Sequence, residues 1–243
     1  ERRSMVMTED EKKLTAYHEA GHAIVGLNVP QHDPIHKATI IPRGRALGLV
    51  LSLPERDQLS VTKTKYKSKI ARAMGGKAAE ELVFGEDQVT SGASSDIQQV
   101  TRIARAMVTQ FGMSESLGNI EYVNEQQTHL GPQSSGVNAS PTTQEAIDRE
   151  VRLLVDTGYE TATRILTEQR QDLENLAQGL LEYETLTGDE IRRVIAGEAL
   201  RRGDDDTPPE EPGGGSSVTA VPTIGKTRPK NDGGPDMEPE PQT

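Results

Sequence analysis

The chain has 243 residues, enough for one sizeable domain, but only 33% of them are hydrophobic and 3% are aromatic. A formal net charge of −11 argues against nucleic acid or an anionic membrane surface as the principal partner, because both require clustered lysines and arginines. The absence of cysteine excludes disulfides, thiolate metal ligands and a cysteine nucleophile.

The first predicted element is a helix that begins after Thr8 and ends near residues 28–30. Thr8 and Glu11 have the spacing of a capping box, which marks the start of a helix. The middle of this helix reads "TAYHEAGHAIVG", with His18 and His22 four residues apart and Glu19 between them. Residues at positions i and i+4 of a helix point the same way, so the two imidazoles can share one metal ion.

The pattern His-Glu-x-x-His on a helix is typical of zinc peptidases, in which both histidines bind zinc and the glutamate reaches a water molecule. The alternative is a structural pair of partly buried histidines. The small residues around the pattern favour the zinc site, because they let another backbone segment approach the helix closely.

A catalytic zinc site needs a third protein ligand, and the residues alone leave its identity open. The extended pattern with a third histidine is absent, because Val25 and Asn28 occupy its positions. We expect the remaining histidines to be ordinary surface residues: His32, His36 and His129. The candidates that remain are the carboxylates Asp96, Glu80 and Glu81. A short side chain at a helix start is held rigidly, which slightly favours Asp96.

The stretch "KATIIPRGRALGLVLSLP", residues 37–54, predicts two short strands and a turn around residues 42–44. It is the only strong β signal in the chain. A second helix is predicted from Lys63 to Phe84, ending at Gly85, and Gly75-Gly76 within it indicates a close contact with another helix.

A third helix should follow "TSGASSD", with Ser94 or Ser95 as its cap and Asp96 near the positive end of its dipole. Its apolar face should be formed by Ile97, Val100, Ile103, Ala104, Met107 and Val108. Residues 121–141 are polar and predict a loop.

Three more helices are predicted after this loop. Thr142 with Glu145 should cap the start of a long amphipathic helix. A second helix should contain the leucine-rich residues 173–181, and Thr187 with Glu190 should cap a short third helix. The expected fold class is therefore mainly α, with one small β-hairpin.

The last 41 residues differ in composition from the rest of the chain. Residues 203–243 contain nine acidic and three basic residues, 8 of the 14 prolines and no aromatic residue. Such a segment cannot bury enough apolar surface to offset its ordering entropy. We predict a folded domain over residues 1–202 and a disordered acidic tail over residues 203–243.

The motifs "TAYHEAGHAIVG", "HKATIIPRGRALG", "GGKAAEELVFG", "TSGASSDIQQVTRIARAMVTQFGMS" and "LTGDEIRRVI" occur in the order found in the peptidase domain of the FtsH family. Residues 1–200 resemble this family of membrane-bound ATP-dependent zinc metalloproteases. The resemblance implies that His18, His22 and Asp96 bind zinc, that Glu19 is the catalytic base, and that Glu80 orients a ligand histidine. Ser95 stands where many relatives have asparagine.

The resemblance also implies a longer protein, in which transmembrane helices and an AAA+ ATPase module precede this domain. The chain begins at Glu1, and it contains no phosphate-binding loop, no apolar run of about 18 residues and no signal peptide. We therefore expect a soluble fragment, and ATP would bind only in the missing module. The implied full-length protein is a homo-hexamer in the bacterial cytoplasmic membrane, with this domain facing the cytoplasm.

The implied substrates are unfolded or membrane proteins, delivered by the ATPase. Thr39, Ile40 and Ile41 resemble the family's edge strand beside the cleft, to which an extended substrate could add as a further strand. The competing interpretations are a helical scaffold with a structural metal site and a helical adaptor that assembles around the long helix. A structural zinc site normally has four protein ligands and no use for Glu19.

Overall fold

Six α-helices and five short strands make up the part of the chain that the computed structural model describes, residues 7–42, 47–54, 58–128, 131–137 and 139–200. In chain order they are α1 (Glu9–Asn28), β1 (Ile35–Thr39), β2 (Leu49–Ser52), α2 (Lys63–Phe84), α3 (Ser94–Thr109), β3 (Val123–Thr128), β4 (Gly131–Val137), α4 (Pro141–Glu168), α5 (Arg170–Tyr183), β5 (Thr185–Thr187) and α6 (Gly188–Ile195). Two 3₁₀ turns, Glu86–Gln88 and Ser91–Ala93, join α2 to α3. The expectation of a mainly α fold is confirmed.

Helices α1 and α2 cross closely at two glycines. A Cβ atom on Gly21 would lie 2.3 Å from the carbonyl oxygen of Gly75, so neither position has room for a side chain. The close contact predicted from Gly75-Gly76 is therefore present, and its partner is the helix that carries the two histidines. This crossing fixes where α2 lies relative to His18 and His22.

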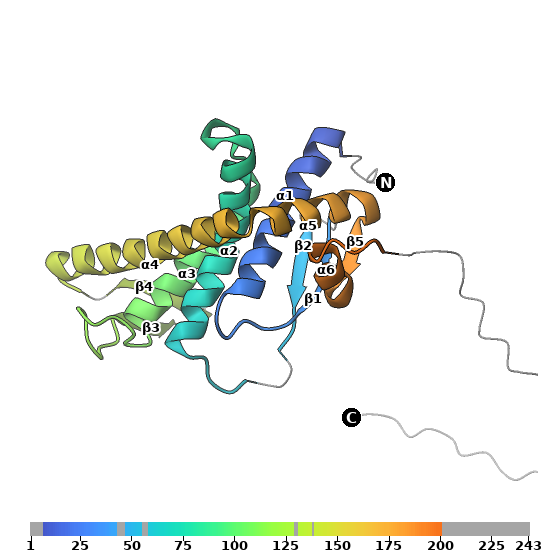
Figure 1. Ribbon diagram of the computed structural model, residues 1–243. Coiled ribbons are helices and arrows are strands. Elements are labelled where there is room, and N and C mark those ends of the chain that lie inside the picture. Colours follow the sequence, from blue (N-terminus) through green and yellow to red (C-terminus); the bar gives the residue numbers. More distant parts are fainter. Residues whose placement is uncertain (1–6, 43–46, 55–57, 129–130, 138, 201–243) are drawn as a thin grey trace, which may run out of the picture. The chain divides into compact units, whose positions relative to one another are not determined.

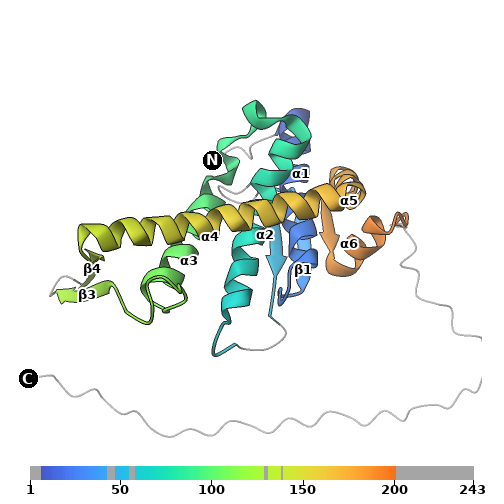
Figure 2. The same cartoon turned by 60° about the vertical axis from the view of Figure 1, so that its left-hand side comes forward.

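The long helix α4 runs across α2 in Figures 1 and 2, and it also packs against α3. Its apolar face closes the core over α2, with Ile147, Val151, Ala162, Ile165 and Leu166 buried. Helix α5 covers α1 from another side through Leu173, Leu176 and Leu180. Burying each such leucine contributes roughly 1.5–3 kcal/mol, so this core holds α1 and α2 in place.

The small sheet has the order β2-β1-β5, and both neighbours of β1 are antiparallel to it. The predicted pair of strands corresponds to β1 and β2, while residues 43 and 44 of the predicted turn lie outside the described residues. The third strand, β5, was not predicted. Three residues are too short for a hydrophobic pattern to reveal a strand, and β5 is stabilised by pairing with β1, which is distant in sequence.

The segment predicted as a loop, residues 121–141, contains the antiparallel pair β3 and β4 instead. The loop prediction was therefore wrong. It relied on polarity alone, and main-chain pairing can form a hairpin without an apolar face. The hairpin lies between α3 and α4 in the sequence and does not belong to the sheet that contains β1.

The helix starts show which capping predictions hold. The capping boxes of Thr8 with Glu11 and Thr187 with Glu190 are both present. Helix α4 begins two residues earlier than predicted: Ser140 caps it, and Pro141, whose fixed φ suits a first helical turn, takes the next position. The prediction that Thr142 opens α4 was wrong.

The predicted caps of α3 were also wrong. Ala93 occupies the N-cap without a side-chain hydrogen bond, and Ser94 is already helical. Thr90 instead caps the preceding 3₁₀ turn by accepting a hydrogen bond from the Gly92 backbone. In α3, Val100, Ala104, Met107 and Val108 are buried as expected and Ile103 is partly buried, whereas Ile97 is 43% exposed.

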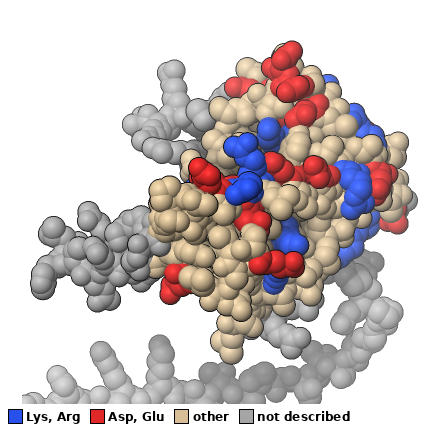
Figure 3. All heavy atoms as spheres, turned by 90° about the vertical axis from the view of Figure 1, so that its left-hand side faces the viewer, with Lys and Arg blue, Asp and Glu red and all other residues tan. Residues whose placement is uncertain are grey.

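Basic and acidic side chains are intermingled on the face that Figure 3 presents, without a large patch of one sign. In the described part of the chain, none of the helices combines the length and the apolar character needed to cross a bilayer. The described residues fall within one compact unit, Glu1–Arg201. The predicted boundary at residue 202 and the predicted disordered tail lie outside the described residues.

Candidate metal centre

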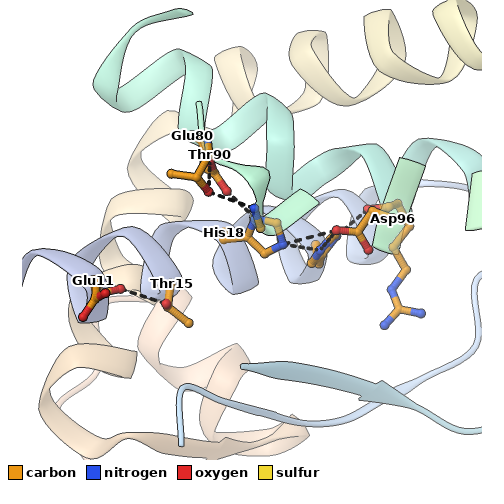
Figure 4. A network of polar contacts seen from close by, with 9 residues as sticks. Glu11, Thr15, His18, Glu80, Thr90 and Asp96 are labelled. Carbon is orange, nitrogen blue, oxygen red and sulfur yellow. Dashed lines mark hydrogen bonds and ion pairs between the residues drawn. The ribbon is translucent and has the colours of Figure 1, made fainter. Parts of the chain in front are cut away.

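Three side chains from two helices converge beside the crossing of α1 and α2. They are His18 and His22 of α1 and Asp96 in the first turn of α3. Figure 4 shows Asp96 and Glu80 on different sides of the His18 ring. The two Nε2 atoms lie 3.1 Å apart, and Asp96 Oδ2 lies 3.3 Å from His18 Nε2 and 3.5 Å from His22 Nε2. The three atoms therefore form a nearly regular triangle.

The size of this triangle matches the spacing of zinc ligands. Ligand atoms about 2.0–2.1 Å from a tetrahedral zinc ion lie roughly 3.3 Å from one another. Two imidazole nitrogens and one carboxylate oxygen are also a ligand set that occurs at catalytic zinc sites. The residues present thus fit a zinc ion in both spacing and chemistry.

The opposite ring nitrogens fix how the imidazoles point. His22 Nδ1 lies 2.9 Å from the carbonyl oxygen of Arg72, which can only accept a hydrogen bond, so this Nδ1 donates. His18 Nδ1 lies 2.7 Å from Oε1 of Glu80. With hydrogen on both Nδ1 atoms, each Nε2 is the ring nitrogen left to bind a metal ion, and any proton on Nε2 would leave when the metal binds.

Glu80 is fully buried and lies behind His18, on the side away from the triangle. Its second oxygen accepts hydrogen bonds from the backbone nitrogen of Thr90, 2.8 Å, and from the Thr90 hydroxyl, 3.1 Å. Burial would raise the pKa of Glu80, but the bonds from His18 and Thr90 lower it below its usual value. Glu80 is therefore an ionised acceptor that fixes the His18 ring.

The electrostatics of the triangle favour a cation. Burial lowers the pKa of His18, but hydrogen bonds to Asp96 and Glu80 outweigh it and raise this pKa to about 10. Burial raises the pKa of Asp96, and its bonds to His18 and His22 more than reverse this effect. The two carboxylates thus provide negative charge around the point where the two Nε2 atoms meet.

Glu19 lies next to the triangle on α1 and is 6% exposed. The backbone of Gly48, just before β2, comes so close that a Cβ atom there would lie 2.5 Å from Oε1 of Glu19. Burial raises the pKa of Glu19, while His22 and His18 act in the opposite direction. The carboxyl group is therefore held in a partly desolvated position where it can exchange a proton.

Gly76 of α2 makes room for both rings. A Cβ atom on Gly76 would lie 2.5 Å from His18 Cε1 and 2.7 Å from His22 Nε2. The sequence showed that this glycine marks a close contact but not that the contact is with the imidazoles. Thr90 orients His18 through Glu80, and the Arg72 carbonyl orients His22 directly. Neither was identified from the sequence, because nothing in a local pattern relates them to α1.

The other carboxylates and histidines do not join the triangle. Glu81, the neighbour of Glu80, accepts a hydrogen bond from Tyr159 instead. His36 is exposed, as expected. His32 is partly exposed in the loop after α1 and packs next to Gly26, so it is a partly covered surface histidine. His129 lies outside the described residues.

The predicted edge strand lies in the middle of the sheet. Thr39 of β1 pairs with Leu49 of β2 and with Thr185 of β5. Ile40 is buried and donates its backbone N–H to Glu184, while Ile41 is 46% exposed. The prediction that residues 39–41 form an edge was wrong, because β5 occupies the side that the sequence left open.

The edge nearest the triangle belongs to β2. The backbone N–H of Ile40 points toward β5. The backbone N–H and C=O groups of the even-numbered residues of β1 therefore point toward β5, and those of its odd-numbered residues point toward β2. Their register partners Leu49 and Leu51 consequently point their backbone groups to β1, and those of Val50 point to the other side, where none of the described strands pairs with β2. Gly48, which approaches Glu19, leads directly into this edge.

Comparison with known proteins shows the family to which the chain is similar. A family model described as peptidase family M41 matches residues 5–194. The protein described as ATP-dependent zinc metalloprotease FtsH from Caulobacter vibrioides is 53% identical over 199 residues, which is 81% of this chain and 32% of the relative. Proteins with the same description from Rickettsia bellii and Haemophilus influenzae are 50% and 46% identical over 200 residues, covering 82% of this chain and 31% and 32% of the relatives. The chain thus spans about a third of the length of the curated relatives it matches.

Proposed function

The chain belongs to peptidase family M41, and we propose that it is the zinc-dependent endopeptidase domain of an ATP-dependent protease. The observation that carries the proposal is the triangle of His18 Nε2, His22 Nε2 and Asp96 Oδ2, with atoms 3.1–3.5 Å apart and a buried Glu19 beside it. His18, His22 and Asp96 would hold the zinc ion. Glu80 would orient His18 without binding the metal.

The bound metal and the Glu19 carboxylate would have different roles in peptide hydrolysis. When bound, zinc supplies Lewis-acid polarisation of a peptide carbonyl and lowers the pKa of a water molecule toward about 7. The Glu19 carboxylate takes the proton of the attacking water and later delivers it to the leaving amine nitrogen. Burial favours this role, because a partly desolvated carboxylate holds a proton more readily than one in water.

A structural zinc site fits the described residues less well. Such a site is normally closed by four protein ligands, and within the described ranges only three potential ligand residues meet here. A structural site would also not need the buried carboxyl group of Glu19. We therefore favour catalysis over the scaffold and adaptor interpretations.

An extended peptide is proposed to bind along β2 rather than along residues 39–41. The open side of β2 begins at Gly48, next to Glu19, and offers the backbone N–H of Val50, whose carbonyl already accepts a hydrogen bond from Arg72. Main-chain pairing at a sheet edge tolerates many side chains, which suits the degradation of unfolded or membrane proteins.

The larger assembly is part of the same proposal. The relatives are described as ATP-dependent, and the phosphate-binding loop that ATP hydrolysis needs does not occur in these 243 residues. An AAA+ module in the full-length protein would supply this activity and deliver substrates. A homo-hexamer in the bacterial cytoplasmic membrane, with this domain on the cytoplasmic side, completes the proposed arrangement.

Metal content measured together with proteolysis tests the proposal. The purified chain should contain about one zinc ion per molecule and cleave casein or an unfolded peptide. Chelation should remove both the metal and the activity, and added zinc should restore both. A chain that retains zinc stoichiometrically but cleaves no unfolded substrate at any zinc concentration would contradict the proposed activity.

A further inference from the structure

Arg72 is a cationic residue that connects the metal centre to the open edge of β2. Its backbone carbonyl receives the hydrogen bond from His22 Nδ1, 2.9 Å. Its side chain extends from α2 to the sheet, where Nη2 donates to the carbonyl oxygen of Val50 at 2.7 Å. The guanidinium group therefore lies on the side of β2 where we place the substrate.

This guanidinium has no counter-ion among the described residues. The carboxylates of Glu19, Asp33 and Asp96 are near enough to interact with it electrostatically, yet none lies within ion-pair distance. Burial lowers the pKa of Arg72, which shows that its charge is partly desolvated. A desolvated cation without a carboxylate is costly for a folded protein.

The guanidinium also has one buried donor without a described partner. In the described part of the chain, two buried side-chain polar atoms lack a hydrogen-bond partner: Nε of Arg72 and Oγ of Ser52. Ser52 is the last residue of β2, and the Arg72 side chain is hydrogen-bonded to β2 at Val50. Both unpaired atoms are therefore associated with this strand. Leaving a buried donor unpaired costs about 1–3 kcal/mol, and a ligand that supplies the missing acceptor would recover part of it.

We propose that Arg72 determines substrate specificity by binding an acidic side chain of the peptide that lies along β2. The proposal rests on the proposed peptidase function and adds a preference at one substrate position. Val50 takes one hydrogen of Nη2, so the second Nη2 hydrogen remains to form, together with a hydrogen of a neighbouring guanidinium nitrogen, a forked pair with an Asp or Glu carboxylate. A neutral peptide carbonyl would provide an acceptor but would leave the positive charge unbalanced.

Peptide binding without turnover provides the first test. The full chain carrying Glu19→Gln, loaded with zinc, would be titrated into fluorescent peptides that have Glu, Gln or Lys at one position of a fixed neutral sequence. We expect one position at which the Glu peptide binds roughly tenfold more tightly than the Gln peptide, the size of one charged hydrogen-bonded pair. Arg72→Gln should remove this preference, and Arg72→Glu should transfer it to the Lys peptide.

Two further variants separate recognition from a structural role. Arg72→Lys keeps the charge without the fork and should retain part of the preference for Glu. Lys67→Gln removes an exposed positive charge from the same helix and should leave the preference intact. Zinc content and melting temperature of each variant show whether the site remains folded. Loss of affinity for all peptides alike in Arg72→Gln and Arg72→Glu would overturn the proposal, because a merely structural role changes no relative affinity.

Cleavage of the same peptides by the chain with Glu19 intact distinguishes the two proposals. If no peptide is cleaved while the Glu preference in binding depends on Arg72, the peptidase function fails and the recognition site stands. If peptides are cleaved but Glu, Gln and Lys peptides bind and react equally at every position, the role of Arg72 is refuted and the peptidase function stands.

Discussion

The Glu80 carboxylate meets His18 at Nδ1, 2.7 Å away, on the side of the ring opposite to the Nε2 atom that faces Asp96. One imidazole therefore separates two of the three carboxylates that the residues alone left as competing ligands. This geometry gives them different roles, since a metal ion at the triangle would contact Asp96 and would be one ring away from Glu80.

We predict that Asp96→Ala weakens zinc binding far more than Glu80→Gln does. Removing Asp96 takes away one of three proposed ligands, whereas Glu80→Gln changes only the group that orients His18, typically a loss of about 10–100-fold in affinity. Competition with a fluorescent chelator measures both affinities. Equal losses, or a larger loss for Glu80→Gln, would contradict the assignment.

We predict that Glu19→Gln keeps zinc and loses peptide hydrolysis. Glutamine preserves the shape of the side chain beside Gly48 but cannot accept a proton from water. His18→Ala and His22→Ala should instead lose both metal and activity, which makes them matched controls. Zinc analysis and peptide cleavage on the same samples decide the matter, and a fully active Glu19→Gln protein would refute the role of Glu19.

The neighbouring glycines Gly75 and Gly76 should respond differently to alanine. A Cβ atom on Gly75 would lie 2.6 Å from the backbone oxygen of Gly21, so the two helices must separate, at a cost of about 1–3 kcal/mol or more. A Cβ atom on Gly76 meets the imidazoles instead, and side chains can move. Gly76→Ala should therefore weaken zinc binding with little effect on the free energy of unfolding. Gly75→Ala should strongly lower the free energy of unfolding.

Urea unfolding without zinc and zinc titration of the folded variants separate these two effects. Leu153→Ala is a suitable control, because this leucine of α4 is 59% exposed and its loss should change stability by less than about 0.5 kcal/mol. The same loss of stability in both glycine variants would contradict the distinction.

His32 should make the fold less stable in mild acid. Burial and the positive charge of Arg72 lower the pKa of His32 from 6.5 to about 4. The unfolded chain therefore takes up the proton more readily than the folded one, and stability falls as pH decreases from about 6.5 to about 4. Because the ring is only half-buried, we expect a contribution of about 1 kcal/mol.

Urea midpoints of the unsubstituted chain and of His32→Gln at pH 7, 5 and 4 check this expectation. The variant should lose less stability over this range, since glutamine does not titrate. Parallel pH profiles for the two proteins would show that His32 is not held neutral in the folded state.

Truncation after Arg202 should leave zinc content and peptide cleavage unchanged within error. The prediction depends on composition, because residues 203–243 contain too few apolar groups to form a packed core. A shorter chain that loses zinc or activity would show that the tail packs against the rest of the protein. Size-exclusion chromatography and zinc analysis of both forms provide the comparison.

Local chemistry let the sequence determine much of this protein. The spacing of His18 and His22 places both rings on one helix face, and the capping boxes at Thr8 and Thr187 mark helix starts with residues only three apart. The long apolar faces of α4 and α5 follow helical periodicity as well. These features depend on neighbours in sequence, so a linear pattern contains them.

Only the tertiary structure decided which groups meet across the chain. Glu80 and Asp96 are both acidic residues near helix ends. They lie on opposite sides of the His18 ring, because α2 crosses α1 on one side and α3 begins on the other. β5 pairs with β1 although the two strands are about 146 residues apart along the chain. The sheet edge is therefore β2, and not the strand that contains Thr39, as the sequence predicted. The Arg72 side chain is hydrogen-bonded to Val50 of β2 because the fold brings α2 within reach of this strand, and no local sequence pattern predicts that arrangement.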